Sequence, residues 1–151
     1  MTEIRFYHLQ KQTLDQVLPQ ILTKALAGGH RIAVKLPDMQ AVEQMNGHLW
    51  TYAPDSFLPH GSAKDGNEGE QPIFLTYTND NPNESDVLIT GHGAEPPPEE
   101  VENYTLCCEM LNGFDEESVT AARGRWKTYK DKGFDVTYWQ QSETGKWEKK
   151  A

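Results

Sequence analysis

This 151-residue chain has only two cysteines, Cys107 and Cys108, which are neighbours in the sequence. Adjacent cysteines can bridge only through a strained ring, so we interpret both as buried free thiols, which suits a reducing compartment. No apolar run approaches the roughly 18 residues that a membrane span requires. Residues 1–7 lack the long apolar region and the cleavage site of a signal peptide. The sequence therefore predicts a cytoplasmic protein without a membrane partner.

Motifs for cofactor binding and catalysis are also absent. Residues 9–13, the predicted first strand-to-helix turn, contain no glycine that would let a phosphate approach the backbone, and no P-loop occurs. The five histidines are far apart, without H-x-x-x-H spacing, and C-x-x-C is missing. His92 follows a predicted strand, where α/β enzymes place catalytic groups, but no nucleophile motif accompanies it. We expect no cofactor, no metal and no catalytic residue; an enzyme centred on His92 is the weaker alternative.

Positive charge is scarce in most of the chain and concentrated near its end. Residues 1–122 hold 6 Lys and Arg against 19 Asp and Glu, whereas residues 123–151 hold 8 against 4. Five of these basic residues surround a tryptophan and a tyrosine in residues 123–134. A sequence pI near 4.9 disfavours general binding to duplex DNA. The basic segment can instead attract an anionic partner to one place.

The spacing of apolar residues predicts alternating strands and helices. We expect strands at 4–9, 31–36, 72–77, 86–90 and 134–139, and helices from Thr13 to Gly28, from Asp38 to about Trp50 and from Asp115 to Gly133. Residues 104–111 are apolar and fit either a strand or a helix end. This order is typical of a three-layer α/β fold: a mostly parallel central sheet with helices on both faces, without a dinucleotide motif.

The remaining segments are expected to connect these elements. Residues 56–60 read as a short extended segment at a sheet edge, because Pro59 cannot donate to a sheet ladder. We predict a mobile loop at 61–71, a rigid polar connector at 93–100 and a single domain over 1–140. Residues 141–151 are predicted to be a flexible polar tail.

The last predicted helix carries the candidate binding residues. Arg123, Lys127 and Lys130 recur at i, i+4 and i+7, beside an apolar stripe that includes Trp126. A solvated helix face is the simplest interpretation of the basic row. The acidic rest of the chain and the adjoining aromatics instead favour a site for an acidic peptide with a hydrophobic end, because Arg can hold a terminal carboxylate bidentately. A direct single-stranded nucleic-acid binder using the same helix is the main alternative.

Several segments together resemble the chi subunit of bacterial DNA polymerase III over nearly the whole chain. The distinctive pieces are the FYHL run at 6–9, the W-x(6)-F-x-P-H spacing at 50–60, the DVLI run at 86–89 and the RWKTYK run at 125–130 that leads to Gly133 and Phe134. The resemblance implies a noncatalytic adaptor in the clamp-loader assembly. Such proteins bind the acidic, Phe-terminated tail of single-stranded DNA-binding protein (SSB), so they meet DNA indirectly.

The resemblance also implies site residues. The SSB-tail site maps onto Arg123 and Trp126, with Lys127 and Lys130 as additions, whereas Val119 stands where some relatives have a lysine. A second surface would contact the small psi subunit or another clamp-loader subunit. It maps onto Trp50, Phe57 and Pro59. The competing interpretation is that Trp50 and Phe57 belong to the core.

Overall fold

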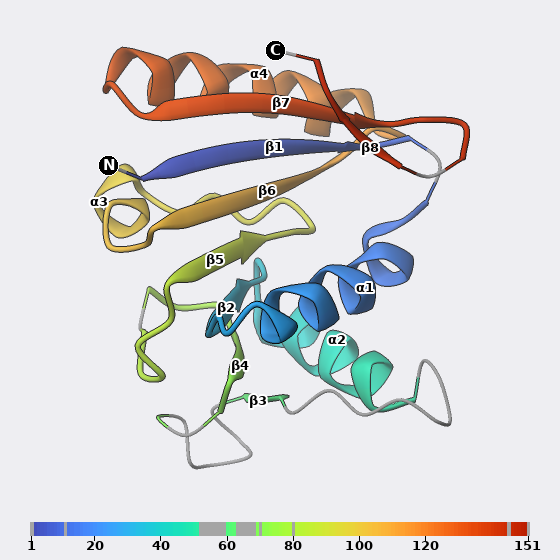
Figure 1. Cartoon of the computed structure of the whole chain (residues 1–151), viewed down its shortest axis with the longest axis vertical. Helices are drawn as coiled ribbons and strands as arrows, with labels where there is room; N and C mark the ends of the chain where they lie inside the picture. Colours follow the sequence, from blue (N-terminus) through green and yellow to red (C-terminus); the bar gives the residue numbers. More distant parts are fainter. Residues whose placement is uncertain are drawn as a thin grey trace.

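The computed structural model describes residues 2–10, 12–51, 60–62, 69, 71–79, 81–144 and 146–150, and for Trp50 only the backbone. These residues form an eight-stranded sheet in the order β3-β4-β2-β5-β6-β1-β7-β8 (Figure 1). The strands are β1 (Glu3–Leu9), β2 (Ile32–Lys35), β3 (His60–Ser62), β4 (Ile73–Thr76), β5 (Val87–Thr90), β6 (Leu106–Asn112), β7 (Asp135–Gln141) and β8 (Trp147–Lys149). The β7–β8 pair is antiparallel and every other pair is parallel. The predicted mostly parallel α/β fold is confirmed.

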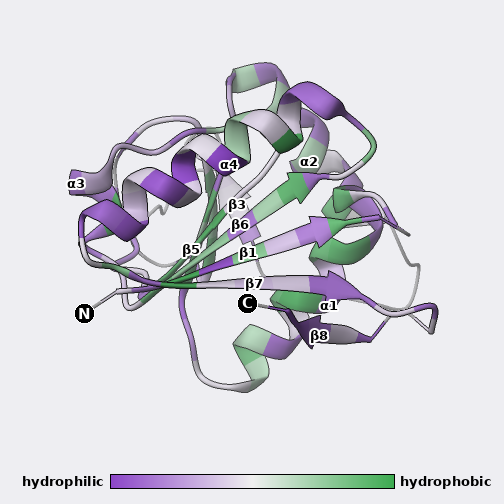
Figure 2. Ribbon diagram, turned by 90° about the horizontal axis from the view of Figure 1, so that it is seen from above, coloured by the Kyte–Doolittle hydropathy of each residue, from purple (hydrophilic) through white to green (hydrophobic). Residues whose placement is uncertain are grey.

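Helices cover both faces of this sheet. They are α1 (Leu14–Ala27), α2 (Met39–Thr51), α3 (Pro98–Val101) and α4 (Glu116–Asp131). Side chains of α1 and α2 share one apolar cluster with the sheet, and side chains of α3 and α4 share another. Successive side chains of a strand point to opposite faces of the sheet, so one strand contributes apolar residues to both clusters. Figure 2 shows α4 and α1 on opposite sides of β1 and β7.

The helix ends follow the local sequence signals. Thr13 and Gln16 form a capping box at the start of α1, and the Asp115 side chain accepts from the Glu117 amide at the start of α4. At the other end of α4, Gly133 has a φ of +87°, and the Phe134 amide donates to the carbonyl of Tyr129. This left-handed glycine ends the helix and turns the chain into β7.

Three segments differ from expectation. Residues 61–62 belong to edge strand β3 rather than to a loop. The connector at 93–100 runs into the single-turn helix α3, where Glu100 is buried in an ion pair with Lys35. Trp147–Lys149 form β8 instead of a flexible tail, because Trp147 packs edge-on against Tyr7 at 4.8 Å between ring centres. Residues 104–111, whose sequence fits either a strand or a helix end, lie mostly in strand β6.

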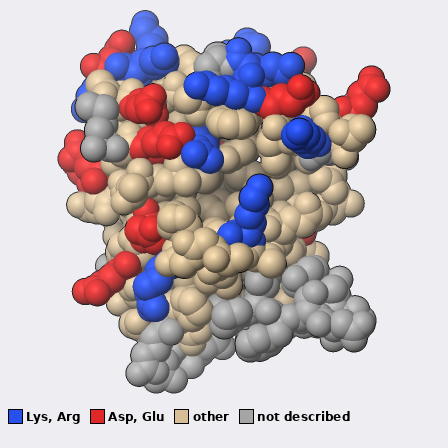
Figure 3. Space-filling view, in the orientation of Figure 1, with Lys and Arg blue, Asp and Glu red and all other residues tan. Residues whose placement is uncertain are grey.

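Charge is unevenly distributed over the surface. Lys and Arg side chains gather at the upper end of the face in Figure 3, where Figure 1 places α4 and β7. None of the helices in the described part of the chain is long and apolar enough to cross a membrane.

Candidate functional site

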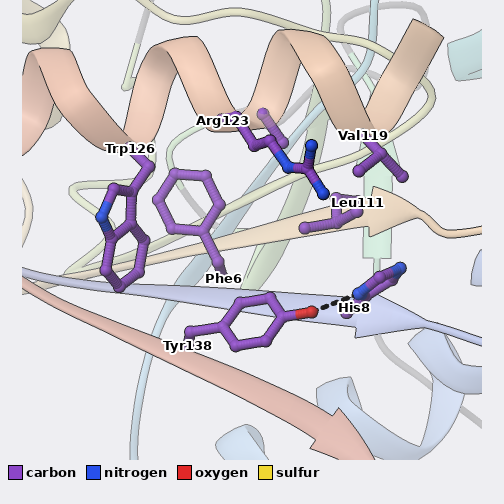
Figure 4. Close-up of a pocket in the computed structure, with 8 residues that line it drawn as sticks. Phe6, His8, Leu111, Val119, Arg123, Trp126 and Tyr138 are labelled. Atoms are coloured by element: carbon purple, nitrogen blue, oxygen red, sulfur yellow. Dashed lines mark hydrogen bonds between the residues drawn. The ribbon is translucent and has the colours of Figure 1, made fainter. Parts of the chain in front are cut away.

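A cavity of about 400 Å³ lies between α4 and the sheet strands β1, β6 and β7. Figure 4 shows its lining side chains, most of which project from one side of α4 or from the sheet beneath it. The lining residues are Phe6, His8, Leu111, Val119, Ala122, Arg123, Trp126 and Tyr138. The cavity is thus mainly apolar, with one cation and one imidazole.

Strand register and helix periodicity bring these residues together. Phe6 and His8 are two residues apart in β1 and therefore share a face. In the neighbouring strands, Tyr138 pairs with Phe6 and Leu111 pairs with His8. On α4, positions 119, 122, 123 and 126 have the i, i+3, i+4 and i+7 spacing of one helix side. Three strands and one helix are therefore needed to build the cavity.

Trp126 forms the aromatic side of the cavity. Its ring lies 5.5 Å from that of Phe6 and 6.4 Å from that of Tyr138, both in edge-to-face geometry. The Lys130 ammonium lies 5.2 Å from the centre of the Trp126 ring. Trp126 is only half-buried. An aromatic ring or other apolar group of a ligand could therefore pack beside it and displace water.

Arg123 supplies the positive charge of the cavity. Its side chain is exposed, and it forms no hydrogen bond or ion pair within the described ranges. Figure 4 shows its guanidinium directed into the space above His8 and Leu111. A guanidinium without an internal partner, beside an aromatic wall, can bind a carboxylate by donating two parallel hydrogen bonds.

His8 and Tyr138 form the polar floor of the cavity. His8 Nδ1 is hydrogen-bonded to the Tyr138 hydroxyl, which also accepts from Gln140 Nε2 at 2.9 Å. Burial and the charge of Arg123 lower the pKa of His8 below its ordinary value. The imidazole is consequently neutral at pH 7 when no anion is bound.

Arg125 lies on the other side of α4 and has a different role. Its Nε donates to both carboxylate oxygens of Glu109, at 2.8 and 3.0 Å, and its Nη1 donates to Glu95 at 3.0 Å. Glu109 is fully buried and also accepts from the Tyr129 hydroxyl at 3.3 Å. Burial raises the pKa of Glu109, and Arg125 opposes that shift. Arg125 thus compensates a buried charge in the core.

The candidate residues from the sequence fall into three groups. Arg123 and Trp126 line the cavity. Lys130 is not a lining residue, but its ammonium contacts the Trp126 ring. Lys127 is exposed on α4 but is not among the lining residues. Phe57 and Pro59 lie outside the described residues, and the Trp50 side chain does as well; the backbone of Trp50 is in the last turn of α2.

Sequence reasoning missed Phe6, His8, Leu111 and Tyr138 as cavity residues. A cue was present for the first two, because alternation in the predicted strand 4–9 places Phe6 and His8 on one face. Leu111 and Tyr138 become neighbours of these residues only through non-local strand pairing.

A second, larger cleft of about 720 Å³ lies at the carboxyl ends of β1 and β6. In α/β sheets a ligand usually binds where neighbouring strands are followed by helices on opposite faces. Here α1 follows β1 and α4 follows β6, and the two helices lie on opposite faces of the sheet. The charged lining of this cleft is mostly acidic, with Asp15, Glu95, Asp115 and Glu117 against Arg125. Asp15 pairs with His92 at 3.2 Å, and Glu95 pairs with Arg125. This charge disfavours phosphate, and among the described residues no three His, Cys, Asp or Glu side chains are grouped so that they could hold a metal ion.

Comparisons with known proteins agree with the resemblance found in the sequence. The family model described as "DNA polymerase III chi subunit, HolC" matches residues 1–137. A probable DNA polymerase III subunit chi of Rickettsia prowazekii is 29% identical over 89 residues, which span 59% of this chain and 54% of that protein. This match therefore covers about half of the relative's length.

Two further relatives match over most of their length. The DNA polymerase III subunit chi of Pseudomonas aeruginosa is 25% identical over 140 residues, covering 90% of this chain and 94% of the relative. The DNA polymerase III subunit chi of Escherichia coli is 22% identical over 146 residues, covering 90% and 96%. Because the family model spans all secondary-structure elements up to β7, including the whole cavity except Tyr138, the chain belongs to the DNA polymerase III chi subunit family.

Proposed function

We propose that this protein is a noncatalytic adaptor of the DNA polymerase III clamp-loader assembly that binds the acidic C-terminal tail of SSB. Family membership supports the assignment to the replicase. The observation that carries the tail assignment is Arg123, which has no partner in the described part of the chain and lies at an aromatic cavity on an otherwise acidic protein. A peptide that ends in an aromatic residue and a free carboxylate has the complementary groups.

The cavity suggests how the tail is oriented. The terminal carboxylate would pair with Arg123, and the terminal aromatic ring would pack against Trp126, Phe6 and Tyr138. Preceding acidic residues would lie toward Lys127 and Lys130 in the second half of α4. The opposite direction leads to Glu116 and Glu117 in the first turn, which would repel them.

The affinity of one tail should be modest. A short peptide buries little surface and loses conformational freedom on binding, so we expect a dissociation constant on the order of micromolar. Several tails on one SSB assembly can raise the overall affinity by avidity. A weak individual contact would also let the replicase exchange between tails during synthesis.

The second proposed surface contacts psi or another clamp-loader subunit through Trp50, Phe57 and Pro59. Its support is the family resemblance together with the position of α2. That helix, which holds the backbone of Trp50, packs on the sheet face opposite to α4. Trp50→Ala should then abolish the subunit contact and leave tail binding intact, whereas a core role would lower the melting temperature and damage both.

Titration with two anionic ligands tests the tail proposal. We would measure binding of an acidic, Phe-terminated peptide and of a single-stranded oligonucleotide at several salt concentrations. The tail site predicts specific peptide binding with moderate salt dependence, because apolar contacts persist after screening. Tight oligonucleotide binding with a steep logarithmic salt slope would instead identify a direct nucleic-acid binder. A peptide that fails to bind at any salt concentration would contradict the tail proposal.

A further inference from the structure

We propose that His8 is a second ligand of the peptide's terminal carboxylate, beside Arg123, and takes up a proton when the peptide binds. This inference rests on the proposed tail site and adds to it a contact from strand β1. The affinity for a carboxyl-terminal peptide should consequently increase as the pH falls.

The first support is the position of the imidazole. His8 lines the same cavity as Arg123, and Figure 4 shows its ring on the sheet, below the guanidinium and to one side of it. A carboxylate held by Arg123 in this cavity would therefore be near the imidazole as well. Gly113 lies beside the ring: a Cβ added to Gly113 would lie 2.4 Å from the Leu9 carbonyl oxygen and 2.5 Å from His8 Nε2 and Cδ2. Any larger residue at 113 would have to displace the ring and the backbone next to it.

The second support is the hydrogen bonding around the ring. Since Gln140 donates to the Tyr138 hydroxyl, the hydroxyl proton is available for His8 Nδ1. The neutral imidazole then carries its proton on Nε2, which faces away from Tyr138. On protonation of the ring, Nδ1–H can donate to the same hydroxyl oxygen, which has a second lone pair. The Tyr138 hydroxyl can thus accommodate both protonation states without moving the ring.

The third support is the set of charges that face the ring. Arg123 approaches from α4, Tyr138 from β7, and the uncharged residues Leu111 and Gly113 from the end of β6 and the turn that follows it. Glu116 lines a neighbouring pocket, which Gly113 and Arg123 also line. Burial and Arg123 lower the pKa of His8 in the free protein. A bound carboxylate would neutralise Arg123 and add an attractive charge, so the pKa should increase in the complex.

The sign of the linkage follows from these two states. The free protein holds His8 neutral at pH 7, whereas the complex favours the imidazolium. Binding therefore takes up protons, and affinity increases as the pH falls through the pKa of the complex. It levels off below the pKa of the free protein. A nearby opposite charge shifts a pKa by about one unit or more, which corresponds to about a tenfold change in affinity across this range.

The experiment uses a synthetic acidic peptide that ends in Phe with a free carboxylate. Its dissociation constant would be measured at constant ionic strength between pH 7.5 and pH 5.5, by calorimetry in two buffers of different ionisation enthalpy. We expect about tenfold tighter binding at the lower pH, together with proton uptake. His8→Gln should remove both effects, so that its affinity no longer changes between pH 7.5 and pH 5.5. His92→Asn, which tolerates the positive φ of that position, is the matched control and should retain both effects.

Further measurements separate the possible failures. An NMR titration of the wild-type imidazoles gives the pKa of His8 with and without peptide, and decides the question even if His8→Gln does not fold. A C-terminally amidated peptide should bind more weakly and without the pH effect. Peptide binding with an unchanged His8 pKa, or pH dependence that persists in His8→Gln, would overturn this inference and leave the tail site intact. Absence of peptide binding at every pH would overturn the proposed function itself.

Discussion

The two sides of α4 use the same type of residue for different purposes. Arg125 faces a fully buried glutamate and is bonded to it, whereas Arg123, two residues earlier, faces an open cavity and has no partner among the described residues. A carboxylate that stays ionised in the core is stabilised by a cation, because an uncompensated charge there is costly. An unpaired cation at an aromatic cavity contributes little to folding and remains available to a ligand. The contrast shows that basic residues of the segment at 123–134 have different roles, and that the role of each depends on the groups it contacts.

The largest expected effect is on stability, from Arg125→Ala. Removing this side chain leaves Glu109 buried without its cation, which should cost about 3–5 kcal/mol in the free energy of unfolding. Urea denaturation followed by circular dichroism measures the change. Arg123→Ala is the matched control and should change the unfolding free energy by less than about 0.5 kcal/mol. Equal losses in both variants would contradict the division of roles.

The next effect is on binding, from Arg123→Ala. Loss of a charge-assisted pair with the terminal carboxylate should weaken tail binding by about 1.5–3 kcal/mol. Fluorescence anisotropy with a labelled tail peptide measures this change, and Lys127→Ala is a control of equal charge outside the cavity that should lose less. A binding curve of Arg123→Ala that overlays the wild type would remove Arg123 from the site.

A pH experiment sharpens the role of Arg125. In Arg125→Met, burial and the charge of Glu95 raise the pKa of Glu109 and only the Tyr129 hydrogen bond opposes them, so this pKa lies further above that of the unfolded chain. The folded state then holds a proton that the unfolded state releases, so the unfolding free energy of this variant should fall as the pH rises above about 4.5. Urea midpoints between pH 5 and pH 8 test this expectation. Adding Glu109→Gln should flatten the profile, and a slope that survives this change would point to another group.

The smallest expected effect comes from Val119→Lys, one turn before Arg123. A lysine at the cavity rim adds a cation for the acidic tail but removes an apolar contact, so the net gain should be about 0.5 kcal/mol and should vanish at high salt. Val119→Met is the control for side-chain length. Tighter binding of the methionine variant at all salt concentrations would show that apolar contact dominates at this position.

Much of the fold could be predicted because the relevant signals are local. Thr13 and Gln16 mark a helix start, and alternation or helical spacing marks most elements. β8 was missed because its pairing depends on Trp147 meeting Tyr7, which is far away in the sequence. The one-turn helix α3 was missed because the Lys35–Glu100 pair that buries it joins distant residues.

The site was predictable on the helix but not on the sheet. Helical spacing alone places Arg123 and Trp126 on one side of α4. His8 and Tyr138 come together in the cavity only through the parallel pairing of β1 with β7. The structural role of Arg125 was hidden for the same reason, since Glu109 lies in another element. One cue existed: a charged residue within the apolar run 104–111 requires a buried partner.

The central claim is that the cavity beside α4 holds the carboxyl terminus of the SSB tail. NMR chemical-shift mapping with an unlabelled tail peptide tests it most directly. We predict that the largest perturbations fall on the Trp126 indole, the Arg123 side chain and the amides of β1 and β7 around His8 and Tyr138. Perturbations centred instead on Asp15 and His92 in the acidic cleft, or none around Arg123 at saturating peptide, would contradict the claim.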